Sequence, residues 1–401
     1  MSCSILQIDG KGQIHDNGRL VSLRGANLGG WLMMEAYFLH SPNDPEQLFK
    51  RDFSRRLGGK ALQDFEQRFR GNFIRRQDIK ILADMGCSCL RVPFNYRLIE
   101  SDPYTYDLDG VAYLDRCIRW ASEEGMRVIL DLHAAPGAQN HQWHSDSLGR
   151  AKLWTSRRYQ KRVRRLWQFL ADRYRREPAV AGYDLLNESV MSDIPVLNRF
   201  YHDLIRDIRE ADPDHILFIE GNNWSMDLEC LDDFADPNWA YSIHFYHPFE
   251  YTFNLIPHQH YPLRGTDGRF GKSTLKKLIG DYARFARERR RPLLVGEFGV
   301  NARDGLYGED RWLADVLEIF NAHGIHWTYW TYKAVKNSVF PDGIYSYYPN
   351  DPWVNRQGPR TGWQTYAELW PDHHQAITRS WRSEQFTPNS AVVDVMKQGL
   401  K

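Results

Sequence analysis

Two glutamates stand at the ends of two separate apolar runs of strand length. The run 183–186 is followed by Asn187 and Glu188, and the run 292–296 is followed by Glu297. A buried strand needs no carboxyl group at its end, so this repeated arrangement indicates that both strands open into a cleft. A pair of facing carboxyl groups is the minimum equipment for cleaving a glycosidic bond.

The alternative is that each glutamate caps its strand and binds a nearby arginine or loop amides, because strand ends are commonly polar. Further side chains argue against it. Polar or aromatic residues also stand at the ends of other predicted strands, and no folding requirement explains why they should recur there. Taken one at a time, an arginine can bridge loops, a histidine can be structural and a tryptophan can belong to the core. The set comprises Arg91, His133, His244, Tyr246 and Trp330.

Eight predicted strands alternate with helical patterns along the chain. In a barrel of parallel strands, all carboxyl ends lie on one rim, so residues that are distant in sequence converge there. The count favours an α/β fold with a single (β/α)8 TIM barrel over a doubly wound sheet. The expected strands are 21–27, 89–95, 128–133, 180–188, 216–221, 240–246, 293–297 and 326–330, and the expected helices are 77–85, 111–124, 156–176, 196–210, 228–234, 275–288 and 311–323.

Segments outside this alternation are expected to decorate the barrel. Residues 5–23 predict a hairpin that turns at Asn17-Gly18 and plugs the barrel bottom. Residues 41–71 are charged and irregular, which indicates an insertion with short helices. No linker divides the chain, so we expect one domain over residues 1–401, with the barrel at about 20–335 and a C-terminal cover at about 340–401.

Composition excludes several classes of function. The chain has 52 Lys and Arg against 51 Asp and Glu, so its formal charge of +1 predicts no nucleic-acid partner. The arginine-rich segment 157–176 has Trp167, Leu170 and Tyr174 at helical spacing, which is typical of a helix with a solvated basic face. Aromatic residues make up 14% of the chain, and rings can pack a core or form platforms for sugars.

The N-terminal residues show no signal peptide, and no apolar segment is long enough to span a bilayer. We therefore expect a cytoplasmic protein without membrane association, or a secreted one if a leader has been removed. Five cysteines without framework spacing suit a reducing compartment. Cys87 and Cys89 form a close pair, but no cluster of further ligands accompanies them, which argues against a metal site.

The ordered set Arg91, His133, Asn187-Glu188, His244, Tyr246, Glu297 and Trp330 resembles glycoside hydrolase family 5, in the clan of retaining (β/α)8 glycosidases. The resemblance spans about residues 20–335. Residues 24–32 with Glu35, and residues 131–140, look like the β-1,3-glucanase branch, whereas 221–224 and 244–249 also look like bacterial cellulases. Ser189 departs from the pattern, since many members have proline after the acid/base.

The resemblance implies roles for the two glutamates. Glu297 would be the nucleophile, with Arg91 and the Tyr246 hydroxyl holding its pKa down. Glu188 would be the acid/base, with repulsion from Glu297 and partial burial raising its pKa toward roughly 6 to 7. A retaining pair stands roughly 5 to 5.5 Å apart, so double displacement through a covalent glycosyl-enzyme is expected.

Supporting roles follow from the same resemblance. Asn187 would bind the sugar 2-hydroxyl, and His133 and His244 would bind sugar hydroxyls or orient Glu188. Trp330 would stack under the sugar, and Glu35 would grip the hydroxyls of the non-reducing end, unless Glu35 only begins a helix. No metal or organic cofactor is expected.

The leading hypothesis is a monomeric retaining hydrolase of β-linked glucose, acting on a β-1,3-, β-1,4- or mixed-linkage glucan or a β-glucoside. Transglycosylation would use the same pair, with a sugar in place of water. A non-catalytic carbohydrate-binding barrel would be expected to lack one carboxyl group, and both are present. Mannan, xylan and glycolipid substrates stay open. The connections 247–272 and 337–375 would decide between exo and endo action, because both are rich in Tyr, Trp, His and Pro.

Overall fold

Eight parallel strands close into a barrel in the computed structural model, which describes residues 4–39, 43–265, 268–347 and 363–401. The first and last strands pair in parallel, with Trp327 opposite Arg24, and this pairing closes the ring. The predicted (β/α)8 barrel is therefore confirmed. In order around the ring, the strands are β4 (Arg24–Asn27), β5 (Cys89–Asn95), β8 (Arg127–Ala134), β9 (Val180–Asp184), β10 (Ile216–Glu220), β11 (Trp239–His244), β14 (Leu293–Phe298) and β15 (His326–Tyr329).

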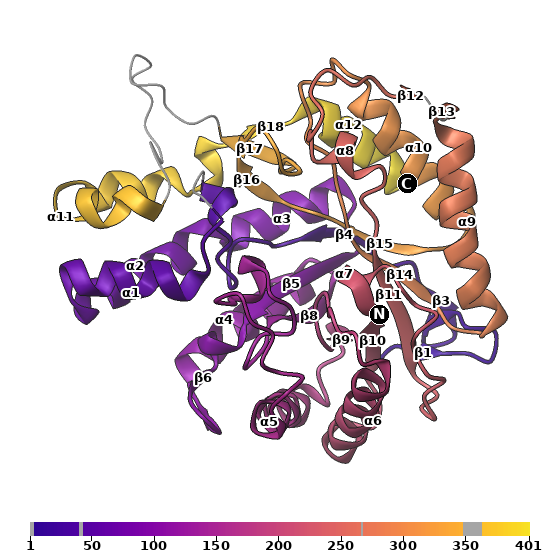
Figure 1. Cartoon of the computed structure of the whole chain (residues 1–401), viewed down its shortest axis with the longest axis horizontal. Coiled ribbons are helices and arrows are strands. Elements are labelled where there is room, and N and C mark those ends of the chain that lie inside the picture. Colours follow the sequence, from indigo (N-terminus) through magenta and orange to yellow (C-terminus); the bar gives the residue numbers. More distant parts are fainter. Residues whose placement is uncertain (1–3, 40–42, 266–267, 348–362) are drawn as a thin grey trace.

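Helices surround the strands, as Figure 1 shows. Each presents an apolar stripe to the barrel and charged residues to solvent. In the arginine-rich helix, for example, Trp167 and Leu170 are buried, whereas Arg173 is exposed and pairs with the half-buried Asp115. The helices that connect or follow barrel strands are α3 (Arg76–Met85), α4 (Leu108–Glu123), α5 (Arg157–Tyr174), α6 (Ile194–Ala211), α9 (Lys272–Glu288), α10 (Glu309–Ala322) and α12 (Ser390–Gly399).

One expected helix does not form. Residues 228–234, between β10 and β11, are irregular, and the helix there is only α7 (Asn222–Ser225). The side chain of Asn198 on α6 forms hydrogen bonds with backbone groups that would otherwise bond within a local helix. It donates to Cys230 O at 2.8 Å and accepts from Asp232 N at 3.0 Å. The Asp227 carboxylate accepts from Glu229 N in the same way. Side-chain hydrogen bonds of this kind compete with helix formation.

The expected N-terminal hairpin lies across the bottom of the barrel. It comprises β1 (Gln7–Ile8), β2 (Ile14–Asp16) and β3 (Arg19–Leu20), and it turns at Asn17 and Gly18, both with positive φ. Leu6, Ile14 and Leu23 are fully buried against side chains that point down from the barrel strands. Those barrel residues are Cys89, Ile129, Ala181, Ile216, Phe218, Ala240 and Leu294.

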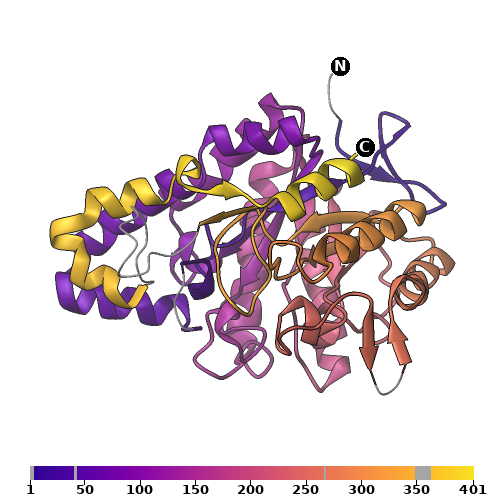
Figure 2. The ribbon, with the colours of Figure 1, turned by 90° about the horizontal axis from the view of Figure 1, so that it is seen from above.

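The insertion after the first barrel strand is more regular than predicted. It forms two helices, α1 (Glu46–Leu57) and α2 (Gly59–Phe73), and the later helix α11 (Trp363–Ser380) packs beside them. The three helices project sideways from the barrel (Figures 1 and 2). Their contact is aromatic, because Phe65 meets Trp370 at 5.1 Å and Trp381 at 5.5 Å between ring centroids.

The remaining elements are short. The expected C-terminal cover was about 340–401, and residues 348–362 of it lie outside the described residues. Within the rest of it, α11 packs on α1 and α2, and α12 packs on α10. No described helix has the length and apolar character of a membrane span. The other elements are β6 (Glu100–Asp102), β7 (Thr105–Tyr106), α8 (Phe249–Thr252), β12 (Leu263–Gly265), β13 (Gly268–Phe270), β16 (Lys333–Val335), β17 (Tyr345–Tyr347), β18 (Thr387–Pro388) and the 3-10 turns Ala36–Leu39, Tyr96–Leu98, Trp143–Ser145 and Ser383–Gln385.

Candidate active site

A pocket of about 470 Å³ opens at the carboxyl ends of the barrel strands, where the sequence predicted convergence. Seven of the nine predicted site residues line it, and the other two, Arg91 and Asn187, are fully buried and hydrogen bonded to each other. The seven are Glu35, His133, Glu188, His244, Tyr246, Glu297 and Trp330.

Arg91 is the polar centre beneath the pocket. Its guanidinium donates to Glu297 Oε1 at 2.8 Å, Asp184 Oδ2 at 2.8 Å and Glu220 Oε1 at 3.0 Å. It also lies 3.1 Å from Asp131. These carboxylates come from four different strands, so a single buried cation ties the inner layer of the barrel together. They raise the pKa of Arg91 further, although its burial acts in the opposite direction.

Glu297, at the end of β14, is held by donors on two sides. Arg91 binds Oε1, and the Tyr246 hydroxyl donates to Oε2 at 2.9 Å. His244 Nδ1 lies 3.5 Å from Oε2. The carboxylate is therefore fixed in orientation, with its remaining surface facing the pocket.

Glu188 lies beyond the end of its strand. The strand β9 stops at Asp184, four residues earlier than predicted, and Glu188 has a positive φ of 48°. Its backbone is held in this uncommon conformation because its N–H donates to Glu220 Oε2 at 2.6 Å and its carbonyl accepts from Asn140 at 2.9 Å. The side chain is thereby turned into the pocket.

The two glutamates meet across a narrow gap. Atoms of Glu188, His244 and Glu297 lie within 4.8 Å of one another, one from each residue. His244 Nδ1 is 2.7 Å from Glu188 Oε1, and its Nε2 is 3.3 Å from Glu220. His144, from the loop after β8, approaches the other oxygen of Glu188 at 3.4 Å.

The pKa order of the two glutamates in the unliganded pocket is opposite to the one predicted. Burial raises the pKa of Glu188, but His144 and His244 outweigh it and leave this pKa below its usual value. Burial dominates at Glu297 and raises its pKa, although His244 and Arg91 act against it. The prediction failed because it missed His144 and gave His244 no effect on the pKa of Glu188. Carboxylates this close titrate as a coupled set.

A second chain of polar side chains lines the pocket beside Glu297, whose Oε1 lies 4.0 Å from His133 Nδ1. His133 lies between Asp131, at 2.8 Å from Nδ1, and Glu35, at 3.0 Å from Nε2. Burial lowers the pKa of His133, but the two carboxylates raise it to about 10. Burial also raises the pKa of Glu35 to about 7. Trp330 stacks on the His133 ring, with centroids 5.3 Å apart, and its indole N–H donates to the Tyr37 hydroxyl at 2.6 Å.

Several site residues were missed by the sequence reasoning. Glu220 does stand near the end of the predicted strand 216–221, so its position was a usable signal, whereas Asp184 fell in the middle of the predicted strand 180–188. The others come from loops, where no periodicity places a side chain. The missed pocket residues include Tyr37, Gln142, Trp143, His144, Trp224, Met226, Phe249, Phe253, Leu255, Phe340 and Pro341.

Within the part of the chain that the structure describes, two acidic groupings have oxygen or nitrogen atoms close enough for a cation. In Asp131, Asp184 and Glu220, the Arg91 guanidinium already supplies the positive charge. In Glu188, His244 and Glu297, the imidazole Nδ1 approaches both carboxylates. Cys87 is a buried thiol whose pKa is raised to about 12 by burial, and neither Cys87 nor Cys89 belongs to either grouping.

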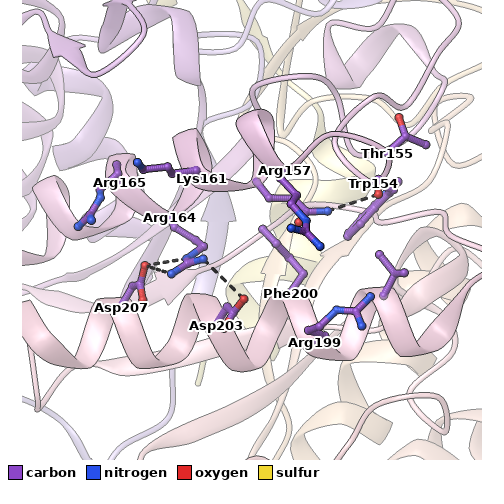
Figure 3. Close-up of a pocket in the computed structure, with 12 residues that line it drawn as sticks. Trp154, Thr155, Arg157, Lys161, Arg164, Arg165, Arg199, Phe200, Asp203 and Asp207 are labelled. Carbon is purple, nitrogen blue, oxygen red and sulfur yellow. Dashed lines mark hydrogen bonds and ion pairs between the residues drawn. The ribbon is translucent and has the colours of Figure 1, made fainter.

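A larger hollow of about 670 Å³ lies between α5 and α6 on the outer surface (Figure 3). Its walls are long basic side chains, and Arg164 is paired with Asp207 at 2.6 Å and with Asp203 at 3.6 Å. Trp154 and Phe200 at its floor are buried, so they offer no open platform for a ring. The hollow contains none of the predicted site residues, and we assign the chemistry to the smaller pocket.

Comparisons with known proteins show the family of this chain. A family model described as Cellulase (glycosyl hydrolase family 5) matches residues 56–336. The chain is 34% identical over 348 residues to a beta-xylosidase of Phanerodontia chrysosporium, covering 82% of this chain and 71% of that protein. It is 28% identical over 319 residues to endoglucanase C of Acetivibrio thermocellus, covering 71% and 92%.

The fold has solved counterparts. The structure of endoglucanase Cel5A from Thermotoga maritima superposes with a TM-score of 0.60 at 20% identity, over 80% of this chain and 91% of that one. This likeness confirms the barrel fold, and the family model matches well over half of the chain. The predicted family is therefore confirmed: the chain belongs to glycosyl hydrolase family 5 and is a glycosidase.

Proposed function

We propose that the protein hydrolyses β-linked glucosides with retention of anomeric configuration, using Glu188 and Glu297. The close approach of Glu188 and Glu297 carries the proposal, because one carboxylate oxygen of each lies within 4.8 Å of the other. Retaining pairs stand roughly 5 to 5.5 Å apart, whereas inverting pairs need roughly 6.5 to 9.5 Å to admit a water molecule.

Glu297 acts as the nucleophile in this proposal. A carboxylate oxygen attacks the anomeric carbon, the bond from that carbon to the aglycone oxygen breaks, and the departing oxygen takes a proton from Glu188. Water then gives a proton to Glu188 and its oxygen displaces Glu297 from the sugar. The two donors on Glu297, Arg91 and Tyr246, favour its ionised form and so oppose the effect of burial.

Glu188 can obtain its proton from His244. Their 2.7 Å contact places one proton between Nδ1 and Oε1, and the charge network raises the pKa of His244 well above its usual value. Transfer across that contact converts the ion pair into a neutral pair, in which Glu188 is the acid. Glu220 stays beside the other ring nitrogen and fixes the orientation of the imidazole.

Asn187 supports the assignment through an unused donor. Its oxygen accepts from Arg91, and its buried Nδ2 has no hydrogen-bond partner among the described residues. A buried donor without a partner costs free energy, so a ligand oxygen in the pocket would relieve it. The sugar 2-hydroxyl is the group expected there, where its hydrogen bond strengthens as positive charge develops on the sugar ring.

The glucose preference rests on the endoglucanase relative and on the motifs resembling glucanases. A β-xyloside is the second candidate, because the relative at 34% identity is a beta-xylosidase. The two sugars differ by the C6 hydroxymethyl group, so matched aryl β-glucosides and β-xylosides separate the candidates by their kcat/KM values.

Proton NMR of the first product tests the mechanism. We expect the β-anomer to appear first, followed by mutarotation, and Glu297→Gln to lower kcat by more than about 1000-fold. Glu188→Gln should lower kcat about 100- to 10,000-fold for substrates with poor leaving groups. An α-anomer appearing first, or undiminished turnover by Glu297→Gln, contradicts the proposal.

A further inference from the structure

The pocket is divided into a polar base and an apolar wall. Eighteen residues line it, and the charged and imidazole side chains gather around the two glutamates. Among the other lining residues, the Tyr37 hydroxyl is engaged with Trp330, and the Tyr246 hydroxyl with Glu297. Gln142 supplies the one amide side chain, and the rest of the described lining is aromatic or aliphatic.

The apolar wall begins on the side of Glu188. Trp224 and Met226 belong to the turn after β10, and this turn is fastened to the backbone that directly follows Glu188. Trp224 N donates to Ser189 O at 3.3 Å, and the Asn222 side chain exchanges hydrogen bonds with Met191 at 2.7 and 2.8 Å. Since Glu188 protonates the departing oxygen, the leaving group must lie against this wall.

The backbone of this turn is strained. Asn223, Trp224 and Ser225 have consecutive positive φ angles of 54°, 54° and 64°. Such conformations are unfavourable for residues other than glycine and persist where the surrounding structure holds them, often at binding sites. Here the strain presents the half-buried Trp224 ring to the pocket instead of turning it into the core.

The outer edge of the wall is aliphatic and open to solvent. Leu255 lines the pocket and is 57% exposed, and the neighbouring Ile256 is 48% exposed. Their amides both bind Glu250 O, at 2.9 and 3.2 Å, which holds the two side chains outward in a tight turn. Large exposed aliphatic side chains at the mouth of a pocket gain free energy when an apolar ligand covers them.

A second sugar is a poor match for this wall. Its hydroxyl groups would lose water on binding and find few side-chain partners there: the described lining offers the indole N–H groups of Trp143 and Trp224, and a Gln142 amide whose nitrogen already lies 3.2 Å from His141 Nε2. Unpaired buried hydroxyls cost free energy, whereas an alkyl or aryl group loses nothing there and buries apolar surface. Aromatic rings accept either kind of ligand, but the aliphatic Met226 and Leu255 favour the apolar one.

We propose that the aglycone site of this enzyme takes an apolar alcohol, aliphatic or aromatic, so that the preferred substrates are β-glycosides of such alcohols instead of oligosaccharides. The proposal rests on the proposed glycosidase function, because it specifies the leaving group of the same reaction. Trp224, Met226 and Leu255 form the wall that recognises it.

Three substrates that share one glycon test the preference: hexyl β-glucoside, cellobiose and laminaribiose. Glucose release should give a kcat/KM for hexyl β-glucoside at least about tenfold above either disaccharide. Met226→Gln and Leu255→Asn should each lower the hexyl β-glucoside value about three- to tenfold, and should lower the ratio of that value to either disaccharide value by at least about threefold. Leu20→Asn, an exposed leucine on β3 at the barrel bottom, is the matched control and should change nothing.

A binding measurement separates this inference from the proposed reaction. Calorimetric titration of the Glu297→Gln protein should show tighter binding of hexyl β-glucoside than of cellobiose, with the difference lost in Leu255→Asn. That binding pattern without any turnover by the unmodified enzyme would overturn the proposed function and support the apolar site. Faster cleavage and tighter binding of the disaccharides, or equal losses on all substrates in both wall variants, would overturn the apolar site.

Discussion

Arg91 shows how much one residue contributes to the site. The side chain is fully buried and contacts four carboxylates, two of which, Glu220 and Glu297, also contact His244. The planar guanidinium reaches these groups in several directions at once, and a lysine ammonium cannot. A lysine in place of Arg91 would therefore leave most of these buried carboxylates without a partner for their charge.

Arg91→Lys should therefore lower the free energy of unfolding by about 3 to 5 kcal/mol, the usual cost of breaking a buried ion pair. Urea denaturation followed by tryptophan fluorescence measures this change. Arg173→Lys on the surface of α5, where Arg173 pairs with Asp115, is the control and should cost less than about 1 kcal/mol. Equal effects of the two substitutions would argue against the buried network.

His144 should set the upper pH limit of activity. It lies 3.4 Å from Glu188 and lowers the pKa of that carboxyl, although burial lowers the pKa of His144 itself to about 4. Replacing it by phenylalanine keeps a planar ring but removes both nitrogens, so the pKa of Glu188 should rise. Because Glu188 must be protonated to act as the acid, the basic limb of the kcat/KM profile should then move to higher pH.

The matched control for His144→Phe is His141→Phe, since His141 lies in the same loop but is exposed and does not line the pocket. Its pH profile should match that of the unmodified enzyme. An unmoved or acid-shifted basic limb in His144→Phe would show that Glu188 does not respond to this imidazole.

The sequence located those site residues that stand on or just after strands. Arg91, His133, His244, Glu297 and Trp330 were found because strand ends of a barrel share one rim. His144 and Trp224 were not, since loop residues follow no period that places their side chains. The pKa order of the two glutamates was wrong for the same reason, because one of the two imidazoles at Glu188 comes from a loop.

At the scale of elements, the seam between the last and first barrel strands depends on a histidine. His326 on β15 is buried, and its Nδ1 accepts a hydrogen bond from Leu23 N, just before β4, at 3.1 Å. Burial, assisted by the nearby Arg24 charge, lowers the pKa of His326 to about 4. An accepting ring nitrogen must be unprotonated, which agrees with that direction.

This pKa makes the seam sensitive to acid. The pKa of a histidine in the unfolded chain is about 6.5. Between pH 6.5 and 4, His326 is therefore protonated in the unfolded chain but not in the folded protein. The stability that neutral His326 provides is therefore present above pH 6.5 and lost as the pH falls toward 4. Its contribution to the free energy of unfolding should fall by about 2 kcal/mol between pH 7 and pH 5.

Urea denaturation at the two pH values measures this loss. His326→Asn keeps an acceptor for Leu23 N but cannot be protonated, so the pH dependence should shrink by that amount. His202→Asn, at an exposed histidine paired with Asp232, is the control and should leave the dependence unchanged. A pH dependence that is the same in His326→Asn and the unmodified protein would contradict this account.

Element boundaries were predictable where hydrophobic period and capping agree. The strand 89–95 was found to the residue, and Gly86 ends α3 in the left-handed conformation, as a glycine after a helix should. The stretch 228–234 was predicted as a helix but is irregular. The prediction failed because Asn198, more than 30 residues before Cys230 and Asp232, forms the hydrogen bonds with their backbone groups. Bonds of such sequence separation leave no local pattern.

At the scale of the whole molecule, α1, α2 and α11 join distant parts of the chain. Phe65 on α2 is fully buried, and its ring meets Trp370 on α11. The sequence did not predict two long, regular helices at α1 and α2, because their apolar stripes pack on α11, which lies far away in sequence. Each stripe on its own looked like part of a charged, irregular insertion.

Phe65→Ala should lower the free energy of unfolding by about 3 to 5 kcal/mol, because the surrounding rings cannot close over the cavity. It should also make α11 more sensitive to limited proteolysis, which mass spectrometry of the fragments would show. Lys60→Ala, at an exposed position of the same helix, is the control and should have little effect. Unchanged proteolysis in Phe65→Ala would mean that other contacts hold α11 in place.

The pairing of α2 with α11 also bears on how the protein is made. The aromatic stripe of α2 leaves the ribosome about 300 residues before α11, on which it packs. Strand β4 likewise leaves the ribosome about 300 residues before β15, the strand with which it pairs. Through most of translation, both the exposed rings and the open sheet edge are available to other chains. We therefore expect the nascent polypeptide to need shielding from other chains until its last quarter emerges.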